Sequence, residues 1–127
     1  MKSFSFTVPI HPDSRTWGMN GVYSQTKHWV ARKSQASQVH TLVRAQIRSV
    51  SRNVRKFDKP VSVRIFYNSR LDIDNHGYLA KLIVDGMKGI LIEDDNRRFV
   101  RSLYQGFHNG DKNLILVEVE ENDDSRK

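Results

Sequence analysis

The sequence contains no cysteine, which excludes a disulfide framework and a thiolate metal site. It also lacks any apolar run long enough to cross a bilayer. The N-terminus alternates apolar and polar residues and has no apolar segment of the signal-peptide kind. We therefore expect a cytoplasmic protein with no membrane partner.

Acidic residues are nearly missing from the first half of the chain. Residues 1–60 hold eleven Lys and Arg against two acids, a formal charge of +9, whereas residues 61–127 hold ten against twelve, a charge of −2. A regional excess of positive charge is typical of nucleic-acid binding. The alternative is a solvated basic face that serves solubility, and the uneven distribution favours the first interpretation.

The length of 127 residues suits a single domain, here spanning 1–127. Alternating apolar residues predict four strands, at 3–10, 60–67, 97–104 and 113–120. Apolar residues at spacings of three and four predict two helices, at 27–53 and 76–88. The order indicates an α+β fold, a small mixed β-sheet with two helices packed on one face.

The connecting segments carry their own signals. Residues 11–26 are predicted to form a long loop, and residues 121–127 a flexible tail. Gly110-Asp111 predicts a hairpin between the last two strands. Asn75 is the expected N-cap of the second helix and Gly89 its expected stop.

Arginines recur along the first predicted helix, at Arg44, Arg48, Arg52 and Arg55. A basic stripe of this kind can follow a phosphate backbone. An ordinary solvated helix face explains the spacing equally well, so the stripe alone leaves both interpretations open.

Two acidic clusters stand out in this basic chain. Asp72 and Asp74 follow a predicted strand, and in an extended segment residues two apart share one face. Asp94 or Asp95 returns after the second helix and is expected to reach the same point. An all-oxygen set of this kind favours Mg²⁺ or Mn²⁺. The alternative is that Asp94-Asp95 forms a simple turn. His76 is a further candidate, as a ligand or a base.

These clusters form part of a recognisable motif. Asp72-Ile73-Asp74-Asn75 is followed by Lys81-Leu82-Ile83-Val84-Asp85-Gly86-Met87 and by Gly89-Ile90-Leu91-Ile92-Glu93-Asp94-Asp95. The pattern resembles the RusA family of Holliday-junction resolvases, crossover junction endodeoxyribonucleases of DNA recombination and repair. Pro12-Asp13-Ser14 after the first strand is also similar. The specific part of the resemblance is confined to residues 72–95.

The resemblance implies a homodimeric endonuclease, commonly carried by phages and prophages, that nicks four-way DNA junctions with Mg²⁺ or Mn²⁺. The metal-binding aspartates of the family correspond to Asp72, Asp74 and Asp95, and its important lysine corresponds to Lys81. The spacer before Lys81 is about three residues longer than in the family, which is most of a helical turn.

DNA contacts are expected from the basic residues. The chain carries Leu71 where the family often has a basic residue, with Arg70 one position earlier. The candidate contacts are Arg44, Arg48, Arg52 and Arg70. Two alternatives remain open, a metal-dependent nuclease for other branched DNA such as flaps, and a non-catalytic DNA-binding module with structural aspartates.

Overall fold

The computed structural model describes residues 2–12 and 29–122, so most of the expected loop at 11–26 lies outside the described residues. The elements are β1 (Ser3–Val8), α2 (Trp29–Val50), β2 (Val61–Tyr67), a 3₁₀ helix η1 (Ile73–His76), α3 (Gly77–Met87), β3 (Val100–Phe107) and β4 (Ile115–Glu121). The predicted α+β class is confirmed.

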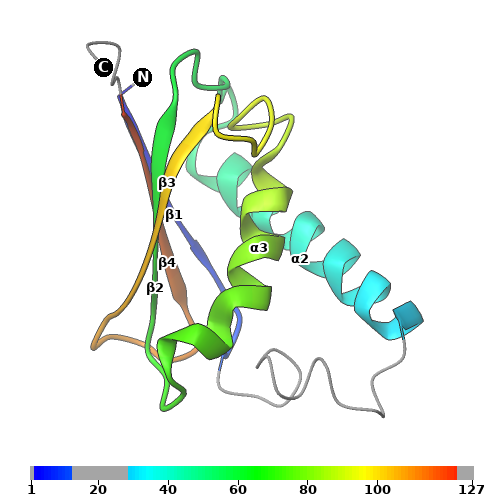
Figure 1. Ribbon diagram of the computed structural model, residues 1–127. Helices are drawn as coiled ribbons and strands as arrows, with labels where there is room; N and C mark the ends of the chain where they lie inside the picture. The colour runs from blue at the N-terminus through cyan, green and yellow to red at the C-terminus, as the bar shows by residue number, and fades with distance from the viewer. Residues whose placement is uncertain (1, 13–28, 123–127) are drawn as a thin grey trace.

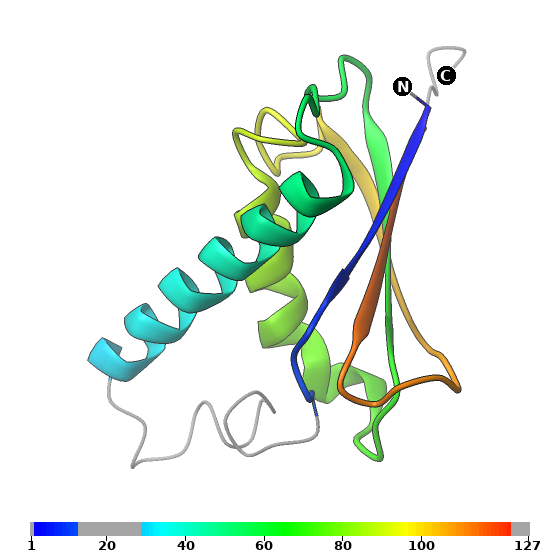
Figure 2. The ribbon, with the colours of Figure 1, turned by 180° about the vertical axis from the view of Figure 1, so that it is seen from behind.

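The four strands form one mixed sheet in the order β1-β4-β2-β3. Strand β2 pairs with β3 in parallel and with β4 antiparallel, and α3 supplies the crossover that parallel strands require. Both helices cover the same face of the sheet (Figures 1 and 2).

The predicted hairpin between β3 and β4 is wrong, because β2 lies between these strands. The chain does turn near Asp111, whose carboxylate accepts a hydrogen bond from the Asn113 N–H at 2.8 Å. The inward face of β2 is fully buried at all four alternate positions, Val61, Val63, Ile65 and Tyr67. Because its inward face is fully buried, β2 is most stable with a hydrogen-bonded strand on each of its edges.

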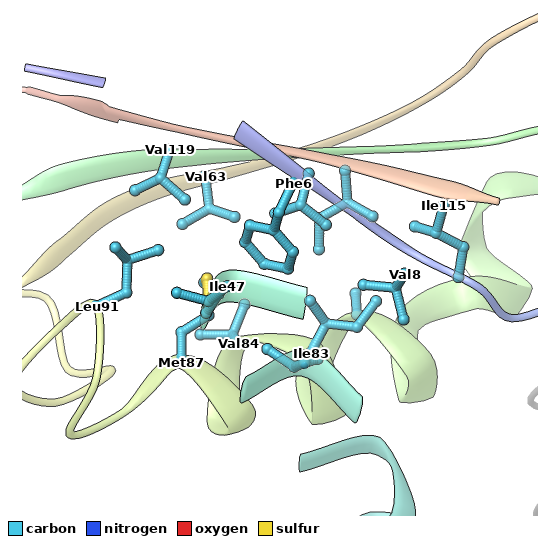
Figure 3. Close-up of a cluster of buried hydrophobic side chains, with 14 of the residues drawn as sticks. Phe6, Val8, Ile47, Val63, Ile83, Val84, Met87, Leu91, Ile115 and Val119 are labelled. Carbon is cyan, nitrogen blue, oxygen red and sulfur yellow. The ribbon is translucent and has the colours of Figure 1, made fainter. Parts of the chain in front are cut away.

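The core fills the space between the sheet and the two helices (Figure 3). It combines the inward side chains of the strands with the apolar stripes of α2 and α3 and with the segment after α3. The buried residues labelled in Figure 3 are Phe6, Val8, Ile47, Val63, Ile83, Val84, Met87, Leu91, Ile115 and Val119.

Most element boundaries differ from the sequence prediction by one to three residues, and the differences at β3 and β4 bear on the sheet. Strand β3 begins at Val100, three residues later than the predicted 97–104, because 97–99 form a turn. Strand β4 continues to Glu121, whose N–H donates to the Lys2 carbonyl at 2.8 Å. The expected flexible tail is therefore wrong at its first residue, and 123–127 lie outside the described residues.

Helices α2 and α3 cross closely at a glycine. A Cβ atom added at Gly86 would lie 3.0 Å from Val43 Cβ and 3.3 Å from His40 Cα. We expect Gly86→Ala to lower the free energy of unfolding by about 1–3 kcal/mol, since the helices must move apart. Urea unfolding measures the change.

Gly77→Ala is the matched control, because a Cβ there meets nothing within 4 Å and the backbone is already helical, with φ −58°. Alanine is the better helix former, so this variant is expected to keep or raise stability by up to about 1 kcal/mol. Equal losses for the two variants would contradict the close crossing.

Candidate functional site

Asp72 and Asp74 lie between β2 and α3, and both side chains are exposed. Asp72 has an extended backbone (φ −64°, ψ 150°) and is the N-cap of η1, whereas Asp74 lies inside η1. The Asn75 N–H donates to the Asp72 carbonyl at 3.0 Å. The expected extended segment with both carboxylates on one face is therefore wrong, since η1 turns the chain between them.

Within the described residues, no basic side chain is paired with either of these two carboxylates. Neither Asp72 nor Asp74 forms a salt bridge with another residue in the ranges 2–12 and 29–122. Arg70 is exposed two residues before Asp72. This end of the sheet therefore presents two unpaired acids to solvent within the described part of the chain.

The ends of α3 fit the sequence predictions only in part. Because η1 precedes α3, the N-cap is His76, which makes no capping hydrogen bond through its side chain, so the prediction of Asn75 as N-cap is wrong. Gly89 has φ +80°, a left-handed conformation that glycine adopts without strain, and its role in ending the helix is confirmed.

His76 belongs to the core and not to the exposed acids. Its side chain is fully buried and its ring stacks on that of Tyr67, with centroids 4.1 Å apart. Ser69 Oγ lies 2.9 Å from Nε2 of His76. Burial raises the pKa of Tyr67, whose hydroxyl donates to Gln105 Oε1 at 2.9 Å. These contacts of His76 hold the start of α3 against the end of β2.

Asp94 and Asp95 lie at the opposite end of α3. The helix has eleven residues, roughly 16 Å at 1.5 Å per residue. After it, the Leu91 carbonyl accepts a hydrogen bond from the Phe57 N–H at 2.9 Å, which places this segment near the start of β2. Figure 1 shows the chain after β2 at one end of the sheet and the chain after α3 at the other.

The three predicted metal ligands therefore do not meet within one chain. Among the described residues, no group of three His, Asp or Glu side chains is placed to hold a metal ion. The expectation that Asp95 reaches Asp72 and Asp74 is wrong for a single chain, because α3 runs back along β2 to its far end. The described residues of one chain therefore do not fit a three-aspartate metal centre.

Lys88 organises the second acidic cluster, and the sequence analysis missed it. Its Nζ lies 3.2 Å from Asp95 Oδ2, 3.4 Å from Asp85 Oδ1 and 3.9 Å from Asp94 Oδ1. The hydrogen bond to Asp95, together with the charge of Asp85, raises the pKa of Lys88. The available signal was the spacing of Asp85 and Lys88, which are three residues apart on the predicted helix at 76–88.

The Lys88 cluster predicts a pH dependence of stability. A lysine with a raised folded pKa contributes stability that is present below its unfolded pKa of 10.5 and is lost as pH rises through the folded value. Replacing Lys88 with methionine is expected to cost under about 1 kcal/mol near neutral pH, because the cluster is solvated. In urea unfolding, the gap between wild type and K88M should shrink above about pH 10.5; a gap that widens there would contradict the ion pairs.

Lys81 is exposed on α3, between the two acidic ends. It lies one turn after Gly77 and one turn before Asp85, so it shares the outer face of the helix with Asp85. The structure places it on the solvent side of the helix that joins the clusters.

The arginines do not form one helical stripe. Helix α2 ends at Val50, so the expectation is wrong for Arg52 and Arg55, which follow the helix and are exposed. Arg44 donates from Nε to the Gly86 carbonyl at 3.3 Å and from Nη2 to the Lys88 carbonyl at 3.2 Å. Arg44 thus binds carbonyl oxygens at the end of α3.

A hollow lined by basic residues lies along α2, beside the contact between Arg44 and the end of α3. Its volume is about 550 Å³, and its charged or titratable lining residues are Lys33, His40, Arg44 and Arg48. The rest of the lining consists of the small residues Ala36, Ser37 and Thr41.

Comparisons with protein-family models and with curated proteins find no match for this chain. The described part of the chain contains no helix that is both long and apolar enough to span a membrane. The functional assignment therefore depends on the motif at residues 72–95 and on the charges described above.

Proposed function

We propose that this protein is a metal-dependent endodeoxyribonuclease that nicks four-way DNA junctions. The observation that carries the proposal is the exposed pair Asp72 and Asp74 in a chain of net charge +7. Unpaired carboxylates on a basic surface repel phosphate, so they weaken DNA binding unless they hold a cation. Carboxylate oxygens are the ligands that Mg²⁺ and Mn²⁺ prefer.

The placement of the basic residues supports DNA as the substrate. Arg48 and Lys33 line the hollow along α2, and Arg70 stands beside the exposed acids. Contacts of this kind fix a duplex by its phosphates and carry no sequence information. We propose these residues, with Arg44 and Arg52, as the backbone contacts.

The proposed metal ligands are Asp72, Asp74 and Asp95, with Lys81 as a phosphate contact. Because one chain does not bring the three aspartates together, the proposal requires a second copy of the chain. A homodimer has a two-fold axis, and a four-way junction offers matching symmetry for paired nicks.

The experiment compares synthetic junction, flap and linear duplex substrates under identical conditions, with Mg²⁺ and with a chelator. Preferential nicking of the junction in Mg²⁺ supports the proposal. Preferential nicking of the flap would move the assignment to another branched DNA.

A non-catalytic DNA-binding module is the second candidate. The separation of Asp95 from Asp72 and Asp74, and the neutralisation of Asp95 by Lys88, favour it. It predicts binding that weakens steeply with salt but no cleavage with any divalent ion. The same three substrates therefore distinguish the candidates.

A further inference from the structure

Exposed arginines gather at the end of the sheet where β2 and β3 begin. They lie in the loop after α2 and in the segment that leads into β3. No salt bridge joins any of them to another residue in the ranges 2–12 and 29–122. Within that part of the chain, their charge is available to a ligand. We call this set the arginine surface, and it consists of Arg52, Arg55, Arg97, Arg98 and Arg101.

Backbone hydrogen bonds hold the two segments of the arginine surface together. The Phe57 N–H donates to the Leu91 carbonyl, and the Val61 N–H donates to the Phe99 carbonyl, both at 2.9 Å. Phe57 is also buried in the core. Figure 1 shows the loop after α2 and the loops after α3 at the same end of the sheet. The arginines therefore belong to one surface, although more than forty residues separate Arg52 from Arg97 in the sequence.

The turn that carries Arg97 and Arg98 is organised by Asn96. Its Oδ1 accepts a hydrogen bond from the Arg98 N–H at 3.0 Å. Its carbonyl accepts hydrogen bonds from the Phe99 and Val100 N–H groups, both at 2.9 Å. An asparagine that bonds the backbone in this way fixes the turn. The two arginines are thus exposed on a backbone that is already ordered.

Arg101 occupies a special position at the start of β3. Val100 pairs with Val61, but the next pair joins Ser102 to Ser62, so Arg101 is the extra residue of a β-bulge. Bulges leave one residue out of the ladder and redirect its side chain, and they are common beside functional sites. The bulge adds a third arginine directly after the turn with Arg97 and Arg98.

Lysines neutralise part of the acidic charge at this end. Segments 51–60 and 85–101 together hold eight basic and five acidic residues. Lys56 Nζ lies 2.8 Å from Glu93 Oε2, and Lys88 contacts Asp85, Asp94 and Asp95 as described above. The lysines therefore face acids of the same chain, whereas the arginines do not. The positive excess at this end is carried by arginine.

We propose that the arginine surface binds the phosphate backbone of a duplex DNA arm. Guanidinium groups form paired hydrogen bonds with phosphate and are less strongly hydrated than ammonium groups. The surface is built from loops and the start of a strand, and not from an amphipathic helix, the element that commonly binds lipid. It is separated from the segment with Asp72 and Asp74 by the length of β2, seven residues or about 23 Å. It is thus an anchoring surface distinct from the proposed site of cleavage.

The salt dependence of binding counts the phosphate contacts of this surface. Each lost contact should lower the slope of log affinity against log salt by about 0.9. The variant R97Q/R98Q/R101Q should therefore lower the slope by about 2.7, and R52Q/R55Q by about 1.8. Between about 50 and 200 mM salt, the affinity advantage of wild type over the triple variant should shrink about 40-fold. Fluorescence anisotropy of a labelled four-way junction, with a chelator to prevent cleavage, gives these values.

Lys112→Gln is the matched control. Lys112 is exposed in the turn before β4, at the opposite end of the sheet, and its loss removes one positive charge. The slope for K112Q should match wild type. A triple variant with the wild-type slope would overturn the proposal. It would also fail if K112Q lowered the slope as much as R97Q alone, or if wild type bound anionic vesicles as tightly as duplex DNA.

Nicking assays keep this inference apart from the proposed function, on which its ligand rests. In Mg²⁺, the triple variant should raise the junction concentration for half-maximal nicking and leave the maximal rate near wild type. A reduced maximal rate at an unchanged half-saturating concentration would contradict a pure anchoring role. Wild type that binds with the expected slopes but cleaves nothing would defeat the proposed function and leave the arginine surface standing. Wild type that does not bind DNA would overturn both.

Discussion

Replacing Asp74 with asparagine is expected to lower the rate of junction nicking by about 100-fold or more. The substitution keeps the size of the side chain and removes the charge that the proposed site requires. A loss of this size is typical when one group that stabilises developing charge is removed. Because Asp74 is exposed and makes no salt bridge with a described residue, the fold should be unaffected.

Binding measurements separate this effect from lost DNA affinity. D74N removes a negative charge near phosphate, so junction affinity should stay equal or increase. Asp58→Asn is the matched control, since Asp58 is also exposed but lies in the loop before β2. Nicking by D58N should match wild type. An equal reduction in the two variants would assign the loss to general charge and not to the site.

Replacing Ile83 with alanine is expected to lower the free energy of unfolding by about 2–5 kcal/mol. Ile83 is fully buried on α3 and packs in the core beneath the sheet (Figure 3). The loss combines the transfer free energy of the removed methyl groups with the cavity they leave. Natural domains have a total stability of about 5–15 kcal/mol, so this is a large fraction. Urea unfolding measures it.

Lys81→Ala is the control on the same helix. Lys81 is exposed, so the variant should change stability by no more than about 0.5 kcal/mol. If Lys81 contacts phosphate as proposed, nicking should fall while stability holds. Unchanged nicking by K81A would remove Lys81 from the proposed site, and an unchanged stability of I83A would contradict the core packing.

The helices and strands could be predicted because their patterns are local. Along β2, every second residue is apolar, as at Val61, Val63 and Ile65. In α3, apolar residues recur at helical spacing and place one face of the helix in the core. Gly89 was recognisable as the end of α3 because few residues other than glycine adopt its positive φ. Each of these signals involves residues that lie close together in the sequence.

The arrangement of the strands depends on contacts between distant residues. The turn near Gly110 suggested a hairpin between β3 and β4. Instead, these strands pair with the two edges of β2, whose inward face is fully buried. The same geometry separates the two acidic clusters. Helix α3 returns along β2, and the segment after it lies near the start of β2, away from the segment that follows β2. The role of Lys88 likewise depends on the fold of the 89–95 segment, which the helix spacing does not fix.

The most direct test is strand-resolved cleavage of a four-way junction by the full-length protein, with each of the four strands labelled in turn. The account predicts nicks at symmetric positions in two opposing strands, present with Mg²⁺ or Mn²⁺ and absent with a chelator. A junction that is bound but stays intact with every divalent ion would contradict it.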